Sequence, residues 1–133
     1  MTHNKENGQK SKNGISFEKR FAEATGLSKV LKKDKPFFVN CHGEQQYIDF
    51  DFRFESGGVD YFFDATTTYR SDRLKQKAYN ALVYKTNFEK PCKFFMVVER
   101  MIENGKKKNP RLIHGIDGVL SFEEAKQMIA EEM

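Results

Sequence analysis

The sequence predicts a mixed α/β domain in which one central β-sheet is flanked by helices on both faces. Residues 48–69 alternate apolar and polar side chains, which is typical of a β-hairpin with two different faces. Residues 93–101 form a nearly continuous apolar run, which is typical of a strand buried on both faces. Apolar residues at helical spacing occur before and after these strands, so helices are available to cover the sheet.

Composition limits the domain organisation and the partners. The chain has 133 residues, enough for one domain but not for two. Residues 1–13 are polar or basic and are expected to form a disordered arm, which leaves residues 14–133 as the single domain. No apolar run reaches membrane-spanning length, and the first residues lack the apolar core of a signal peptide, so we expect a cytoplasmic protein without a membrane partner.

Aromatic, cysteine and charge content add three further expectations. Thirteen Phe and five Tyr, with no Trp, indicate an aromatic core. Cys41 and Cys92 lack metal-ligand spacing and are expected to be reduced thiols. The net charge of +4 suits a nucleic-acid partner without requiring one.

The first elements are predicted to form a helix followed by a three-stranded antiparallel meander. Ser16 is a suitable N-cap for a helix that Gly26 ends, with a short turn or a continuation over residues 27–31. A strand over residues 36–41 follows, and residues 42–46 turn the chain into the hairpin. The intervening lysines predict a solvated edge or, alternatively, phosphate contacts: Lys29, Lys32, Lys33 and Lys35.

The alternating segment predicts one specific hairpin register. Gly57-Gly58 suits a two-residue turn that needs positive φ at both positions. If Ser56 and Val59 close that turn, one face is apolar and the other carries the acids. The expected apolar-face pairs are Phe54–Tyr61, Phe52–Phe63, Phe50–Ala65 and Ile48–Thr67; the expected polar-face pairs are Glu55–Asp60, Arg53–Phe62, Asp51–Asp64 and Asp49–Thr66.

Carboxylates gathered on one hairpin face need an explanation, because like charges across a ladder are destabilising. They could form a solvated face that Arg53 and lysines from elsewhere neutralise. They could also form a divalent-cation site, since magnesium and manganese prefer carboxylate oxygens. The pattern itself leaves both interpretations open.

The remaining elements are two helices and two strands. Ser71 is expected to cap a helix from Asp72 to about Thr86, and the buried strand over residues 93–101 follows. A basic loop over residues 103–111 then leads to a short last strand at 111–115, where His114 is a strand-end polar residue. Ser121 and Glu124 predict a capping box for the final helix. The expected order is α-β-β-β-α-β-β-α.

This layout resembles the PD-(D/E)XK nuclease superfamily, which has the restriction-endonuclease-like fold. The matching pieces are Phe17-Glu18 in the first helix, Asp51-Phe52 on one hairpin strand and Asp64-Ala65-Thr66 on the other. A basic helix and a buried strand follow, so the resemblance covers residues 16–98. The motifs are short, and their order and placement carry the comparison.

The resemblance implies a divalent-metal-dependent endonuclease that hydrolyses phosphodiesters in duplex or branched DNA. Asp51 and Asp64 would be ligands of Mg²⁺ or Mn²⁺, with Asp49 as the alternative to Asp51 on that strand. Glu18 would join them through water. No small-molecule cofactor is implied. Because one small domain covers little duplex, we expect a homodimer that cuts both strands.

Thr66 departs from the family pattern, which has a lysine at this position. Either a cation from the next helix replaces that lysine, or the protein has lost catalysis and is a nucleic-acid-binding or protein-interaction module. The candidates for the replacement are Arg70, Arg73, Gln76 and Lys77, and Arg73 and Lys77 lie one helical turn apart. The same four residues, with Lys106, Lys107 and Lys108 and the lysines of the N-terminal arm, are candidates for nucleic-acid contacts.

Overall fold

The computed structural model describes residues 16–100, 102–103, 106–107 and 115–133. Its main sheet is mixed, as the sequence predicts. β4 pairs antiparallel with β3 on one side and parallel with β5 on the other, and β5 pairs parallel with β8. The strands in spatial order are β3 (Phe52–Ser56), β4 (Val59–Thr68), β5 (Cys92–Arg100) and β8 (Gly118–Ser121).

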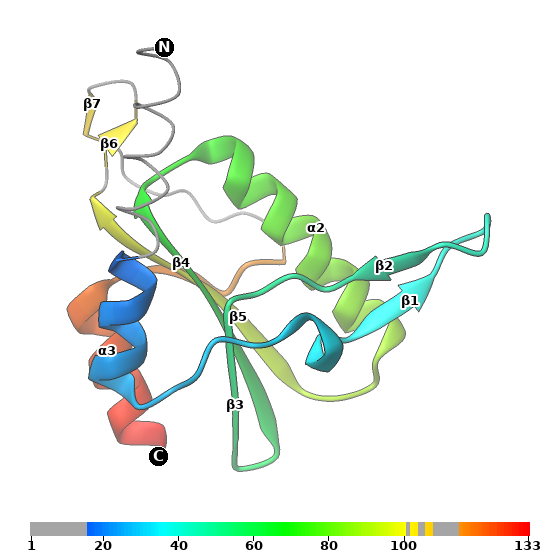
Figure 1. Cartoon of the computed structure of the whole chain (residues 1–133), viewed down its shortest axis with the longest axis horizontal. Coiled ribbons are helices and arrows are strands. Elements are labelled where there is room, and N and C mark those ends of the chain that lie inside the picture. The colour runs from blue at the N-terminus through cyan, green and yellow to red at the C-terminus, as the bar shows by residue number, and fades with distance from the viewer. Residues whose placement is uncertain (1–15, 101, 104–105, 108–114) are drawn as a thin grey trace.

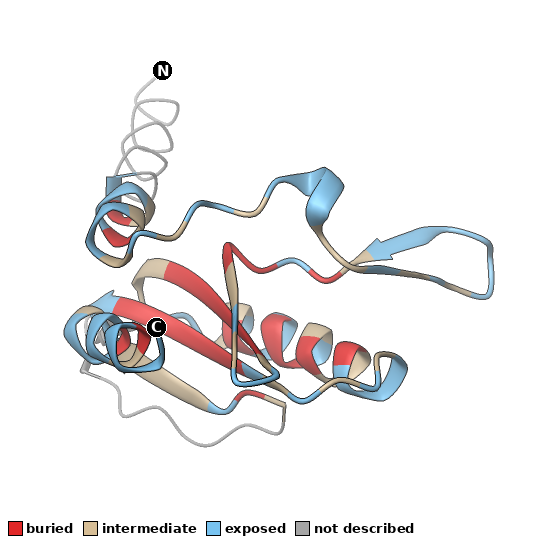
Figure 2. Cartoon of the chain, turned by 90° about the horizontal axis from the view of Figure 1, so that it is seen from below, coloured by how far each residue is buried: buried red, intermediate tan, exposed pale blue. Residues whose placement is uncertain are grey.

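Helices cover both faces of this sheet, so β4 and β5 are buried on both sides (Figure 2). α2 (Ser71–Asn87) packs on one face around an aromatic cluster that includes Phe62 and Phe94. The helix over residues 16–25 and α3 (Phe122–Glu132) pack on the other face around Phe63 and Phe95. The predicted α/β class and the aromatic core are confirmed. In the described part of the chain, no helix is both long enough and apolar enough to cross a membrane.

The β3–β4 hairpin has the predicted register from Ser56–Val59 to Phe52–Phe63. Gly57 and Gly58 have φ of 58° and 79°, as the two-residue turn requires. The ladder stops at Phe52, however, so the four pairs expected beyond it do not form.

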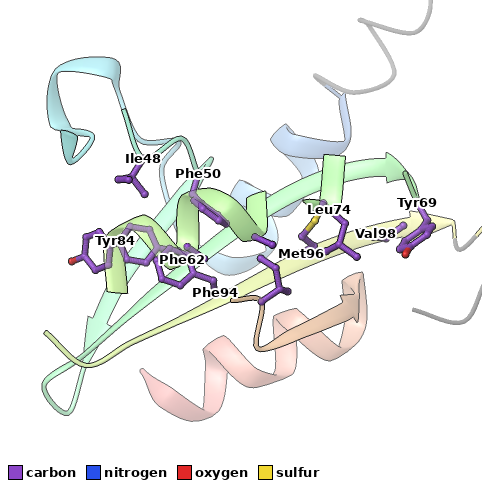
Figure 3. Close-up of a cluster of buried hydrophobic side chains, with 12 residues drawn as sticks. Ile48, Phe50, Phe62, Tyr69, Leu74, Tyr84, Phe94, Met96 and Val98 are labelled. Atoms are coloured by element: carbon purple, nitrogen blue, oxygen red, sulfur yellow. The ribbon is translucent and has the colours of Figure 1, made fainter. Parts of the chain in front are cut away.

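The chain leaves the sheet before Phe52, because the backbone of Asp51 bonds to the segment that follows the first helix and not to β4. The carbonyl of Asp51 accepts a hydrogen bond from the N–H of Val30 at 2.8 Å. Ile48 and Phe50 therefore pack on the α2 side, where the Phe50 ring lies 5.8 Å from that of Phe62 (Figure 3). Phe52 packs on the opposite side of the sheet, so the expectation of one shared apolar face for these residues is wrong.

β1 (Phe37–Val39) pairs with β2 (Gln45–Tyr47) in a separate two-stranded sheet, which projects from the body (Figure 1). The predicted three-stranded meander is therefore wrong, and part of the segment expected to be a turn is strand. The Asn40 side chain accepts hydrogen bonds from the N–H groups of His42 and Glu44, which stabilises a tight turn between the two strands.

Several element ends also differ from expectation. Ser71 is the first residue of α2 rather than its cap, and Ser16 is itself helical. Residues 27–31 form no helix, and a short 3₁₀ helix, η1 (Lys32–Asp34), follows them. By contrast, Gly26 ends the first helix with φ of 77°, and the Ser121–Glu124 capping box is present.

The segment expected to be a basic loop contains a short hairpin, in which β6 (Ile102–Glu103) pairs with β7 (Lys106–Lys107). The last strand of the sheet is β8. The strand expected at 111–115 falls mostly outside the described residues, as do Lys108, His114 and the N-terminal arm.

Candidate active site

The centre of the site is Asp64, a fully buried residue of β4 that lies under the first turns of α2. Its Oδ2 is 3.0 Å from the Nε of Arg73, and its Oδ1 is 3.3 Å from the Nζ of Lys77. Arg73 and Lys77 are one helical turn apart, so α2 presents both cations to the same carboxylate. These are the two helix cations that the sequence singled out as one helical turn apart.

One oxygen of Asp64 is incompletely satisfied. Among the described residues, Oδ1 is a buried side-chain atom that accepts no hydrogen bond. The Lys77 ammonium attracts it but donates its short hydrogen bond to the carbonyl of Asp49. A buried acceptor without a hydrogen bond costs about 1–3 kcal/mol, so this oxygen is energetically disposed to accept a further ligand.

Asp51 is the second buried acid of the site, at the point where the chain leaves the sheet. Its Oδ2 accepts a hydrogen bond from the N–H of Ala65 at 3.1 Å, and Ala65 directly follows Asp64. The two carboxyl groups are therefore neighbours, although the direct pairing of Asp51 with Asp64 that the register predicted does not form.

Burial, the negative charge of Asp64 and then that of Glu18 raise the pKa of Asp51 to about 7. The Ala65 N–H favours the charged form and acts in the opposite direction, but it does not cancel these effects. At neutral pH Asp51 is therefore protonated in about half of the molecules, so its carboxyl group alternates between the neutral and the charged form.

Glu18 and Asp49 lie at the rim of the site and are paired with lysines. Glu18 pairs with Lys29 at 2.9 Å, although its charge still acts on Asp51 and Arg73. Asp49 is more exposed and pairs with Lys35, and with Lys77 at 3.6 Å. Burial would raise the pKa of Asp49, but the two lysines together hold it below its usual value.

The remaining predicted site residues do not contact the acid pair in this arrangement. The Thr66 hydroxyl donates to the carbonyl of Thr68 at 3.2 Å, so it bonds along its own strand. Arg70 pairs with Asp72 at the surface, and Gln76 is exposed. Lys106 and Lys107 lie in β7, and their side chains are outside the described residues.

Sequence reasoning missed the partners of the rim acids. Lys29 and Lys35 belong to a lysine run that indicated only a solvated edge or phosphate contacts. Their pairing with Glu18 and Asp49 depends on how the segment after the first helix folds back along the sheet. No local spacing in the sequence indicates that path.

The buried acids fit part of a ligand set for a hard divalent cation. No group of three or more acidic, histidine or cysteine side chains in the described ranges is arranged to hold a metal. Magnesium, however, is often held by one or two carboxylates, with waters and substrate phosphates completing its coordination. Asp51 and the free oxygen of Asp64 meet that smaller requirement.

Comparisons with protein-family models, with curated proteins and with solved structures found no match to this chain. The functional argument therefore depends on the geometry and chemistry of this site.

Proposed function

We propose that the protein is an endonuclease that hydrolyses DNA phosphodiesters with the help of Mg²⁺ or Mn²⁺. The observation that supports this most directly is the buried pair Asp51 and Asp64 with two cations, Arg73 and Lys77, at the same carboxylate. Acids that hold a metal and cations that neutralise a phosphate are the two components that phosphodiester hydrolysis needs.

The acid pair and the cations have different roles in this proposal. Asp51 and Asp64 hold the metal, which when bound neutralises the scissile phosphate and lowers the pKa of an attacking water. Lys77 is nearly buried and stays next to Asp64, where it supplies the positive charge that Thr66 lacks. The side chain of Arg73 is one-third exposed, so its outward N–H groups are available to a phosphate oxygen.

The substrate in this proposal is duplex or branched DNA, and two copies of the chain act on the two strands. A small restriction-type enzyme, a junction resolvase and a mobile-element nuclease all fit these requirements. Arg70 and Gln76 lie beyond Arg73 on the exposed side of α2 and would contact the flanking backbone.

One observation favours a second candidate, a catalytically inactive module with the same architecture. Both oxygens of Asp64 already face a cation of the protein, and Asp49 is likewise paired with lysines. A site neutralised in this way could bind nucleic acid or a protein partner through Arg73 and the neighbouring surface without holding a metal.

The deciding experiment is incubation of the purified protein with supercoiled plasmid and with branched DNA, in Mg²⁺, Mn²⁺ or chelator. The test variant is Asp64→Asn, and the matched control is Asp60→Asn. Asp60 lies on the same strand and is equally buried, but it pairs with Arg53 away from the acid pair. Its replacement therefore controls for the loss of a buried carboxylate as such.

We expect metal-dependent nicking that Asp64→Asn abolishes and that the folded fraction of Asp60→Asn retains. Cleavage by Asp64→Asn at the wild-type rate would refute the proposed site. DNA binding without cleavage by the wild-type protein in either metal would establish the inactive module instead.

A further inference from the structure

The hairpin of β1 and β2, residues 37–47, is called the arm below and is not to be confused with the N-terminal arm of residues 1–13. Its register places Phe37 opposite Tyr47 and Val39 opposite Gln45, with all four side chains on one face. Phe38 lies on the other face and packs against the aromatic cluster under α2. The arm is therefore anchored on its inner face and carries a second, outward apolar face.

Most residues of the arm are exposed (Figure 2). Phe37 and Val39 are 44% and 58% exposed, which is unusual for large apolar side chains on a short strand. The Phe37 ring contacts that of Tyr47, with 5.9 Å between centroids, and the Tyr47 hydroxyl donates to Gln45. The two rings are tilted by 51° to each other and form an aromatic pair on the outer face of the arm.

A lysine lies next to this aromatic pair, and a second lysine adjoins it in the sequence. The Nζ of Lys32 lies 5.3 Å from the centre of the Tyr47 ring. Lys32 and its neighbour Lys33 are exposed, and neither has an acidic partner among the described residues. Aromatic rings next to unpaired cations are the combination that binds unpaired nucleotides, because bases stack on the rings and phosphates meet the charges.

The base of the arm adjoins the rim of the candidate active site. The N–H of Ile48 donates to the carbonyl of Pro36 at 2.8 Å, which closes the base of the hairpin. Lys35 pairs with Asp49, and Asp49 in turn lies 3.6 Å from Lys77. A nucleic-acid strand held at the rim of the site can therefore also reach the base of the arm.

We propose that the outer face of the arm binds unpaired nucleotides of the substrate, with a base stacked on Phe37 and phosphates at Lys32 and Lys33. This inference rests on the proposed function and deepens it. It names single-stranded DNA as the part of the substrate that the protein holds beside the acid pair. A second copy of the chain fits this face less well, since facing lysines of two copies would repel each other.

The absence of tryptophan from the chain allows a direct test. Phe37→Trp places a single indole on the arm, where Phe37 is 44% exposed, and Met133→Trp places one after the end of α3, where Met133 is 72% exposed. Each variant is titrated in chelator with a single-stranded oligonucleotide, a branched oligonucleotide with unpaired bases, and a fully paired duplex. Chelator prevents cleavage, so binding is measured apart from the proposed function.

We expect quenching of the indole in Phe37→Trp by the single-stranded and branched DNA, and little quenching in Met133→Trp, because α3 lies on the opposite face of the sheet from α2. Phe37→Leu should weaken binding of the single strand about tenfold, because it keeps apolar area but loses the flat ring. Lys32→Gln with Lys33→Gln should weaken binding and reduce its salt dependence, whereas Lys126→Gln on α3 should not.

Several results would overturn the inference. Equal binding by Phe37→Leu, absence of quenching in Phe37→Trp, or failure to bind single strands would each do so. An emission change in Phe37→Trp that depends on protein concentration without DNA would show self-association through the arm instead. Cleavage without quenching would reject nucleotide binding by the arm and leave the nuclease proposal intact. Quenching without cleavage would reject the nuclease proposal and leave nucleotide binding by the arm intact.

Discussion

Asp60 and Asp64 lie four residues apart on the same face of β4, and both are buried, yet their environments differ. Asp60 receives two hydrogen bonds from Arg53, at 2.9 and 2.5 Å, and one from the Tyr84 hydroxyl at 2.9 Å. Burial and this bond to Asp60 raise the pKa of Tyr84 to about 12, so the hydroxyl remains a donor. Asp60 is thus a satisfied structural acid, whereas Asp64 keeps an oxygen without a hydrogen bond.

The raised pKa of Asp51 predicts how stability depends on pH without metal. An acid whose pKa is about 7 in the folded state and near its ordinary 3.8 when unfolded loses stabilisation as pH rises from about 4 to 7. Asp51→Asn cannot ionise and avoids this loss. Relative to wild type, we expect the stability of the variant to increase by roughly 3 kcal/mol between pH 4.5 and pH 8.

Urea denaturation in chelator between pH 4.5 and 8 measures this difference. Asp34→Asn, which replaces an exposed acid outside the site, is the control and should differ from wild type by a constant amount. A stability difference for Asp51→Asn that does not change with pH would contradict the assigned pKa.

At the scale of elements, α2 is held to the sheet by the segment that leads into β8. Ile116 is buried in the cluster under α2, and the N–H of Asp117 donates a hydrogen bond to the carbonyl of Phe94 on β5 at 2.8 Å. Asp117 Oδ2 also accepts from the N–H of Phe94 and from the ammonium of Lys85. Gly115 starts this segment with φ of 104°, directly against α2.

Two glycines with positive φ should therefore respond differently to alanine. A Cβ on Gly115 would stand 2.7 Å from the carbonyl oxygen of Ala78 and 2.9 Å from Leu82 Cγ, whereas one on Gly58 would meet nothing within 4 Å. We expect Gly58→Ala to cost about 1–2 kcal/mol for the left-handed backbone alone. Gly115→Ala should cost about 3 kcal/mol or more, because overpacking adds to that strain.

Thermal and urea unfolding of the two variants measure this contrast. Equal losses would mean that the backbone around Gly115 can move away from α2 at little cost.

Across the whole molecule, the features that could be predicted from the sequence are those that local signals determine. The Gly57-Gly58 turn and the alternation after Phe52 indicate the β3–β4 register, and the capping box indicates the start of α3. The separation of β1 and β2 from the main sheet could not be predicted in this way. It depends on the contact between Val30 and Asp51, which are remote in sequence.

The candidate site likewise has parts that local signals predict and parts that depend on contacts remote in sequence. The spacing of Arg73 and Lys77 follows from the helical period. Asp51, by contrast, approaches Asp64 outside the ladder, through a hydrogen bond from the N–H of Ala65 that the hairpin register does not contain. The choice of Arg73 and Lys77 over Arg70 and Gln76 depends on how α2 crosses the sheet. Hydrophobic packing of α2 decides that crossing, and no spacing within the helix reveals it.

The most general test of the site is whether a divalent cation stabilises the whole fold. A ligand that binds only the folded state raises the free energy of unfolding, by about 2.7 kcal/mol at a concentration of 100 times its Kd. For a domain of this size that corresponds to a rise in Tm of roughly 5–10 °C. Scanning calorimetry with Mg²⁺, Mn²⁺ and chelator should show this rise for wild type.

The variants then locate the cation. Asp64→Asn should lose the metal-dependent rise in Tm, because the oxygen without a hydrogen bond is part of that carboxylate. Asp60→Asn should start from a lower Tm, since it weakens the pair with Arg53, yet keep the full rise. An equal rise in Asp64→Asn would place the cation elsewhere. No rise in any variant would mean that Arg73 and Lys77 already neutralise the acids, as the inactive module requires.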